Sequence, residues 1–401
     1  MLPVDPRLET ALMNTEQRFI ETRAEIWDNQ GKVADVEPSS VDIELADLGD
    51  SVSMEIAADW LTGSGITPAP EFYLGRRLFG EDKFGEHLYG GKEEYKTFLT
   101  GILVPIKNRV RIYTTFKWQG LTEEVYMGEF VVTESDIADT DSEFTVNLSA
   151  EDCGFIVNKI TSPTLSIPKT TDIATSLRVL LPDDDMPTWV SKDFSAVTVG
   201  SAYEGSTLSF VQGENKSAVQ GCNDILSTEG LYLRGNRWAQ MKIEPSRQVV
   251  EDYPAPSFDI NDYENLVTIS INPSGELFAN KVTVYGESPE GTVEASAVDD
   301  WTPYGTQADG LGFELTNYIV SENALLTYQA SNIAYRELEK KARFGEVLEL
   351  TIAPYQTIEV GDTFTLTSES LGLTGSVCVV NRADHSLNFD QPTKLTARRL
   401  T

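Results

Sequence analysis

The stretch RVRIYTTFKWQGLTEEVYMGEFVV, residues 109–132, decides the fold class. In its first half, apolar or β-branched side chains stand at every second position: Val110, Ile112, Thr114, Phe116 and Trp118. A period of two is that of a strand with one buried face. Gln119-Gly120 begins a connection, and EEVYMGEFVV predicts the return strand. The stretch therefore predicts an antiparallel hairpin.

The same alternation recurs on both sides of this hairpin. FIETRAEIW (19–27) places Ile20, Thr22, Ala24 and Ile26 on one face and Glu21, Arg23 and Glu25 on the other. SVSMEI (51–56) and EFTVNLSAED (143–152) repeat the pattern. Spaced alternating strands are typical of an antiparallel barrel or sandwich. We expect such a β-domain over residues 1–158.

A long segment without periodicity, residues 63–94, interrupts this β-domain. It is rich in glycine and carries Phe72, Tyr73, Phe79, Phe84 and Tyr89. Loops of this length inside a compact domain usually contact a partner or carry function. The aromatic loop 72–89 either binds a sugar or packs against a neighbouring subunit, and the sequence leaves both open. His87 lies in it without a second histidine or a cysteine nearby, so we expect a solvated or packing role.

The middle of the chain, residues 159–250, predicts a small α+β domain. TTDIATSLRVLL (170–181) predicts a short helix capped by Thr171, and residues 215–230 predict a second helix closed by Gly230. Gly235-Asn236 is expected to form the turn of a hairpin between two alternating strands.

The last part, residues 251–401, predicts a second β-domain built around one long helix, about 321–344. Ser321 is the expected N-cap, Lys340, Lys341 and Arg343 suit the C-terminal end, and Gly345 supplies the stop. Strands are expected on both sides of this helix. The predicted fold is therefore mainly β, with two antiparallel barrel or sandwich domains flanking the α+β insertion.

The charge balance restricts the partners. Thirty-one basic against sixty-three acidic residues give a net charge of −32, which repels phosphate backbones. Sequence-specific nucleic-acid binding is not expected; the acidity serves solubility, or a surface that must not bind a passing polyanion.

The sequence shows neither a membrane span nor a secretory signal. Cys153, Cys222 and Cys378 are far apart, which predicts buried, reduced packing residues.

Catalytic and metal-binding motifs are missing from the sequence. Two isolated histidines leave no serine-hydrolase triad, and neither a nucleophile elbow nor a phosphate-binding glycine loop occurs. Asp183-Asp184-Asp185 lacks the alternation and glycine of a calcium loop, so we expect a solvated turn. No catalytic, cofactor-binding or metal residue is predicted, and the expectation is not an enzyme. The many acidic residues leave open the hypothesis that two carboxylates cleave a glycoside.

Two sets of motifs resemble known families. LFANKVTVYGE (277–287), a helix over 323–343 and APYQTIEVGDTFTLTSE (353–369) are similar to the tail-hub family of phages and contractile injection systems. The matching positions are Asn280, Val282, Val284, Pro354, Gly361 and Asp362. Residues 104–137 and 146–159 resemble minor tail proteins of siphophages that infect actinobacteria.

The resemblance implies a structural protein of the virion tail tip, made in the host cytoplasm. Hub proteins of this family form homotrimers in which each chain supplies two tube-like domains, so that three chains match a sixfold tube and leave a channel for DNA ejection. Partners would be the tail tube or distal tail protein, tip or fibre proteins and the tape measure protein. The chain stops at Thr401 after the last hub-like strand, so we expect no appended enzyme domain.

Two other functions compete with the hub. A distal tail or receptor-binding module would contact host-surface polysaccharide through the aromatic loop 72–89. A cell-wall hydrolase would use two of the many carboxylates.

Overall fold

The computed structural model describes most of the chain. The described residues are 19–46, 49–59, 66–68, 103–118, 120–139, 143–159, 165–167, 171–197, 208–210, 217–245, 254–271, 278–288, 291–300, 305–307, 310–321, 324–342, 347–387 and 391–400. The aromatic loop 72–89 with His87 lies outside these residues, and so do Arg343 and Gly345.

Most of the described secondary structure is β, which confirms the predicted fold class. The strands of the largest sheet are β1 (Phe19–Asp28), β2 (Gly31–Val36), β3 (Ser40–Ala46), β4 (Ser51–Asp59), β5 (Ile66–Pro68), β6 (Arg109–Trp118), β7 (Leu121–Asp139), β8 (Glu143–Glu151), β14 (Phe258–Asn261), β15 (Leu266–Ile271), β19 (Val347–Ile352), β20 (Thr363–Ser368), β21 (Leu373–Ser386) and β22 (Thr393–Arg399).

These fourteen strands form one sheet whose main path is β15-β19-β22-β21-β3-β4-β8-β7-β6-β1-β2-β5; off this path, β20 pairs with β21 and β14 pairs with β20. The N-terminal and C-terminal strands meet where β3 pairs with β21. That pairing is antiparallel and runs from Arg382 opposite Ala46 to Ser386 opposite Asp42. Backbone hydrogen bonds therefore join the two ends of the chain into a single sheet.

The predicted alternation sets which side chains enter the core. Val110, Ile112, Thr114 and Phe116 are buried, and Ala24 and Ile26 are buried beside them on β1. Gly120 turns the β6–β7 hairpin with a φ of +83°, as expected at the Gln119-Gly120 connection. One apolar cluster continues from these strands through Cys378, Val380 and Leu395 of the C-terminal strands. The two groups of strands therefore share one core.

The insertion has a core of its own. Its elements are α4 (Cys153–Val157), β9 (Leu165–Ile167), α5 (Ile173–Leu180), the 3-10 turn η1 (Asp183–Asp185), β10 (Ser191–Asp193), β11 (Leu208–Phe210), α6 (Ala218–Ser227), β12 (Leu231–Asn236) and β13 (Gln240–Pro245). Strands β10, β13 and β12 form a sheet, against which α4 and α6 pack. The first predicted helix is present, but its N-cap is Asp172 rather than Thr171, because the Asp172 carboxylate accepts from the Thr175 amide. The expected turn at residues 183–185 is confirmed.

The hairpin of the insertion turns later than predicted. Gly235 and Asn236 still pair with Met241 and Gln240, and the turn lies at residues 237–239, where Ala239 has a φ of +55°. Gly235 meets another constraint: a Cβ there would lie 2.4 Å from the Gly154 amide nitrogen. The glycine permits close backbone contact with α4 rather than a turn.

The long helix belongs to a separate small unit. Helix α7 (Thr327–Ala342) packs on a three-stranded sheet of β17 (Gly291–Val298), β16 (Lys281–Ser288) and β18 (Thr316–Val320), with its own apolar cluster. The helix begins six residues after the expected Ser321. The Ser321 amide donates to the Tyr285 carbonyl and so continues the strand pairing, while the Gln329 side chain accepts from the amides of Leu325 and Leu326.

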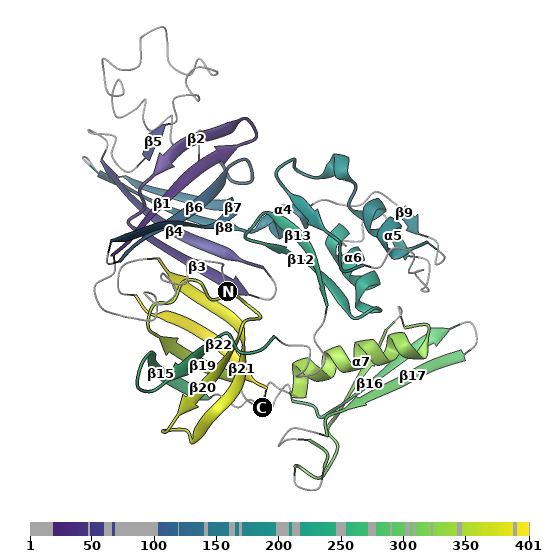
Figure 1. Ribbon diagram of the computed structural model, residues 1–401. Coiled ribbons are helices and arrows are strands. Elements are labelled where there is room, and N and C mark those ends of the chain that lie inside the picture. The colour runs from purple at the N-terminus through teal and green to yellow at the C-terminus, as the bar shows by residue number, and fades with distance from the viewer. Residues whose placement is uncertain are drawn as a thin grey trace.

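Figure 1 shows how these parts are arranged. The N-terminal strands, in purple and blue, and the C-terminal strands, in yellow, are stacked on one side of the molecule. The insertion and the α7 unit lie on the other side, next to each other. Asn332 of α7 donates to the Thr228 carbonyl of the insertion at 2.9 Å. Every helix within the described ranges is too short or too polar to cross a bilayer. The domain limits at 158/159 and 250/251 stay a prediction.

Candidate functional site

A polar hollow lies where the parts of the molecule meet. It has a volume of about 1400 Å³ and extends from the outer face of β3, β4, β8 and β21 to α4, α6, β12 and Arg336 of α7. Its floor is polar because alternate residues of these strands point into the core and the others point out. The outward residues include Asp42, Glu44, Ser53, Ser149, Glu151 and Asp384.

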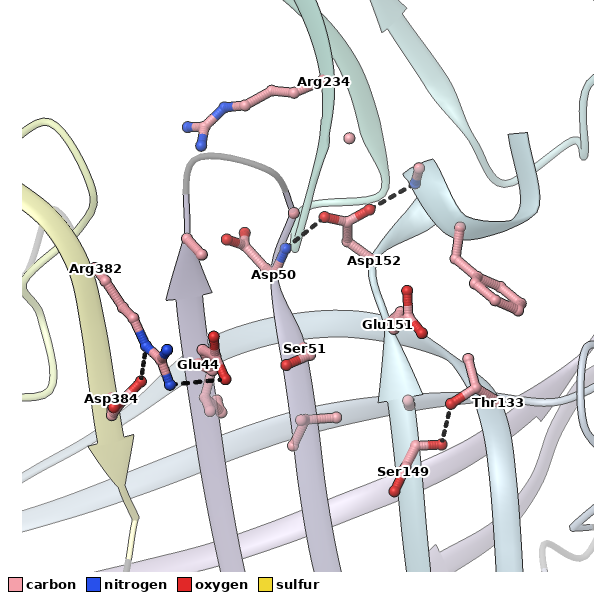
Figure 2. A pocket seen from close by; sticks show the side chains of 18 of the residues that line it. Glu44, Asp50, Ser51, Thr133, Ser149, Glu151, Asp152, Arg234, Arg382 and Asp384 are labelled. Carbon is pink, nitrogen blue, oxygen red and sulfur yellow. Dashed lines mark hydrogen bonds and ion pairs between the residues drawn. The ribbon is translucent and has the colours of Figure 1, made fainter. Parts of the chain in front are cut away.

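The seam between β3 and β21 crosses this floor. Arg382 of β21 contacts Glu44 of β3 at 3.1 Å and Asp384 at 3.0 Å, as Figure 2 shows. All three side chains are well exposed, and such pairs stabilise a fold little. The seam is held mainly by backbone hydrogen bonds and by the core beneath it.

Two buried carboxylates, Asp50 and Asp152, close one end of the hollow. Asp152 directly follows β8 and caps α4: its Oδ1 accepts from the Gly154 amide at 2.6 Å, and its Oδ2 accepts from the Asp50 amide at 2.6 Å (Figure 2). The Asp152 amide donates to the Asp50 carbonyl at 2.9 Å. This clasp joins the start of β4, the end of β8 and the first helix of the insertion.

Burial changes the ionisation of this pair. Desolvation raises the pKa of Asp152 to about 6, and the nearby Asp50 carboxylate adds to the rise, against the hydrogen bonds from the amides. Desolvation also raises the pKa of Asp50, opposed by the charges of Arg234 and Arg237. Both oxygens of Asp152 are engaged by backbone N–H groups, so its role in this geometry is to hold backbone rather than to transfer protons.

Arg237 joins the insertion to both groups of strands. Its side chain is 1% exposed, although it stands at the tip of the β12–β13 hairpin. The Arg237 amide donates to Asp50 Oδ2 at 3.0 Å, and its carbonyl accepts from the Glu129 amide of β7 at 2.7 Å. Its Nη2 lies 3.0 Å from Glu359 Oε1, between β19 and β20. A Cβ at Gly128 would lie 2.9 Å from the Arg237 carbonyl oxygen, so β7 approaches this residue through a glycine.

His385 lies under the seam and is fully buried. Its Nε2 donates to the Ile358 carbonyl at 2.8 Å. Desolvation lowers the pKa of His385 to about 3, and the charge of Arg237 lowers it further, so the ring is neutral. The three cysteines are free and buried, as predicted, and burial raises the pKa of the Cys153 and Cys222 thiols.

The resemblance motifs are found in two different places. Asn280 is buried and bridges the Phe313 carbonyl and the Leu315 amide, while Val282 and Val284 lie in the core under α7. Gly361, with a φ of +87°, and Asp362, which accepts from the Glu359 amide, form the predicted turn in the large sheet. The structure therefore does not bring these motif residues into one site.

Neither Arg237 nor the Asp50–Asp152 clasp was expected. The sequence carries a signal for Asp152 alone, because an aspartate before a short apolar helix is typical of an N-cap. Within the described parts of the chain, no group of three or more His, Cys, Asp or Glu side chains could hold a metal ion.

No protein-family model matches this sequence, and no curated protein matches it. Solved structures do match. A tail protein from Neisseria meningitidis MC58 is similar with a TM-score of 0.60 at 10% identity, over 94% of this chain and 96% of that one. The 43 kDa tail protein of prophage MuSo2 from Shewanella oneidensis gives a TM-score of 0.58 at 12% identity, over 94% and 98%.

Prophage tail protein gp18 from Listeria monocytogenes EGD-e gives a TM-score of 0.51 at 10% identity, over 94% of both chains. At such identities the likeness shows the fold alone. The chain shares, over nearly its whole length, a fold found in phage tail proteins.

Proposed function

We propose that this chain is a structural tail hub, a minor tail protein of the virion. Three copies form a ring of pseudo-sixfold symmetry that joins the tail tube, or a distal tail protein, to the tip or fibre proteins. The ring leaves a channel for DNA ejection, near the tape measure protein. The tail is of the non-contractile, siphophage kind, and the chain is made in the host cytoplasm before assembly.

The observation that carries this proposal is the continuous sheet across β3 and β21. One chain provides two neighbouring groups of strands that share a core, and the clasp and Arg237 fix the insertion against both. A ring component that must present two wall segments per chain needs such rigidity. The shared fold with phage tail proteins supports the same proposal.

The charge of the chain fits a passage for DNA. A net charge of −32 keeps phosphate backbones from binding to its surface. On the described floor of the hollow, Asp42 and Glu151 are exposed carboxylates of the outer sheet face.

The two competing functions are less well supported than the hub. A distal tail or receptor-binding module depends on the aromatic loop 72–89, which lies outside the described residues and stays a prediction. A cell-wall hydrolase depends on carboxylates, and the most buried pair at the hollow holds backbone amides.

Native mass measurement together with negative-stain images of the purified protein tests the hub. A threefold ring with a central hole, at three times the chain mass of 44.3 kDa, is the expected result. A compact monomer that binds cell-wall polysaccharide would contradict it and favour the receptor-binding module. Turnover of peptidoglycan that a single carboxylate substitution abolishes would favour the hydrolase.

A further inference from the structure

The connection between β19 and β20 is buried although it belongs to no strand. Four successive residues in it, Tyr355, Gln356, Thr357 and Ile358, are no more than 5% exposed. Connections normally run over the surface, because a buried one carries polar groups that bulk water cannot reach. The polar atoms of this connection therefore need partners inside the protein.

Two side chains from other elements are anchored at the same connection. His385 Nε2 of β21 donates to the Ile358 carbonyl at 2.8 Å, and the His385 ring is fully buried. Arg237 Nη2 of the insertion donates to Glu359 Oε1 at 3.0 Å, and the Arg237 side chain is 1% exposed. Arg237 is also close enough for its charge to lower the pKa of His385. We call Arg237, Gln356, Thr357 and His385 the polar core cluster.

The polar core cluster contains buried polar atoms without a hydrogen-bond partner in the described structure. These atoms are Gln356 Oε1, Gln356 Nε2, Thr357 Oγ1, His385 Nδ1 and Arg237 Nη1. An unpaired buried polar atom lowers stability, so folded proteins pair nearly all of them with protein groups or with ordered water. Several unpaired atoms at one connection therefore point to a bound ligand.

The hydrogen-bonding chemistry of these atoms restricts the ligand. His385 Nδ1 is an acceptor, because Nε2 carries the ring proton that goes to a carbonyl. Arg237 Nη1 is a donor, whereas the Thr357 hydroxyl and the Gln356 amide can each donate and accept. The ligand must therefore donate to one member of the cluster and accept from another.

The charge of the cluster favours a neutral ligand. The guanidinium of Arg237 is already paired with Glu359, and a buried anion would face the lone pair of His385 Nδ1. A buried cation would lie near the Arg237 charge. A small neutral molecule that both donates and accepts, and that fits among side chains with almost no exposure, is water.

We propose that the polar core cluster binds ordered water, one molecule of which donates to His385 Nδ1. This water accepts from Arg237 Nη1, directly or through a second water, and pairs with Thr357 and the Gln356 amide. Internal waters typically make about three hydrogen bonds to buried polar groups and are part of the fold. The water thus joins the insertion to the C-terminal strands beside the direct ion pair. The proposal does not depend on the hub ring.

Nitrogen-15 NMR of the full chain, labelled in histidine, tests the proposal. The chain has only two histidines, so His385→Gln identifies the ring signals of His385. We expect Nδ1 of the neutral ring to show the shift that accepting a hydrogen bond produces, and the Cε1 proton to show a nuclear Overhauser effect to water. An Nδ1 signal without that shift would overturn the proposal. A shift without contact to water would overturn it as well, since a side chain would then donate to the ring directly.

A matched pair of variants separates the loss of a polar partner from a disturbance of packing. Thr357→Val deletes a hydroxyl and keeps the shape, whereas Ile358→Val deletes one methylene in the same connection. Oxygen-17 relaxation dispersion follows the water oxygen and is unaffected by exchange of hydroxyl protons. We expect Thr357→Val to lose about one long-lived water molecule and Ile358→Val to lose none, since an apolar cavity stays dry.

Equal numbers of long-lived waters in the two variants would contradict the proposal. Both substitutions are small, so both variants are expected to fold, which circular dichroism checks. The histidine spectra of the wild-type chain decide the matter independently of either variant.

Discussion

The guanidinium of Arg237 and the carboxylate of Glu359 lie 3.0 Å apart, although 122 residues separate them in the sequence. The arginine comes from the hairpin of the insertion, and the glutamate comes from the connection between two C-terminal strands. Since the Arg237 backbone also binds Asp50 and Glu129, this one residue contacts three parts of the chain. Arg237 therefore links the insertion to both the N-terminal and the C-terminal strands.

Loss of the Arg237 side chain is expected to destabilise the fold. Arg237→Ala removes a buried stem and the hydrogen bond to the Glu359 carboxylate, which costs about 2–3 kcal/mol in free energy of unfolding. Urea unfolding measures the change. Arg382→Ala is the matched control, since exposed ion pairs such as those at the seam contribute about 0.2–1 kcal/mol. Equal losses of unfolding free energy in the two variants would show that the Arg237 side chain does not stabilise the contact between the insertion and the strands.

His385 makes the fold sensitive to acid. Its pKa is about 3 in the folded chain and about 6.5 when unfolded, so below pH 6.5 the unfolded state takes up a proton that the folded state does not. The contribution of His385 to stability is complete above pH 6.5 and is lost as the pH drops toward 3, about 5 kcal/mol in all. His385→Gln keeps a donor for the Ile358 carbonyl and should flatten this fall. A profile of stability against pH that His385→Gln leaves unchanged would refute the assignment.

Asp152 changes the stability with pH in the direction opposite to His385. Its pKa of about 6 lies above the ordinary value near 3.9, so the folded state holds a proton that the unfolded state releases. The favourable contribution is present below about pH 4 and disappears as the pH rises through 6, on the order of 3 kcal/mol. Asp152→Asn should remove this slope between pH 4 and 6, whatever its effect on absolute stability. Thermal unfolding of both proteins across this range would show it, and parallel profiles would contradict it.

Gly235 is expected to tolerate no side chain. A Cβ there would lie 2.4 Å from both Asp152 Oδ1 and the Gly154 amide nitrogen, so Gly235→Ala forces the hairpin away from α4. We expect a loss of about 1–3 kcal/mol, the range for overpacked sites. Gly372→Ala, where the added atom meets nothing within 4 Å, should cost only about 1 kcal/mol for its φ of +66°. If calorimetry finds Gly235→Ala to be neutral, the close packing is not required.

The sequence predicts local features of the fold well. Alternation alone predicts that Val110, Ile112 and Phe116 are buried, because a strand has a period of two. Local sequence does not predict which strands pair with each other. Residues 42–46 and 382–386 pair although more than 330 residues separate them in the sequence, and nothing local encodes that register. For the same reason, the sequence does not indicate that helix α7 and strands β16, β17 and β18 form a separate unit.

The errors at single residues have physical causes. Gly-Asn is a common turn sequence, but Gly235 allows close backbone contact with α4. The turn is formed by residues 237–239 instead. Ser321 has the chemistry of an N-cap, but pairing of β18 with β16 extends to its amide and delays the helix. Arg237 carries no sequence signal at all, because its burial depends on three segments that only the tertiary fold brings together.

Reconstruction of the tail tip of intact particles that carry this chain, by electron cryomicroscopy without imposed symmetry, tests the central claim most directly. The proposed hub predicts three copies in a closed ring around an open channel, each copy presenting its N-terminal and C-terminal strands as two successive wall segments. A chain found outside such a ring, on a fibre or in single copy at the tip, would contradict the hub.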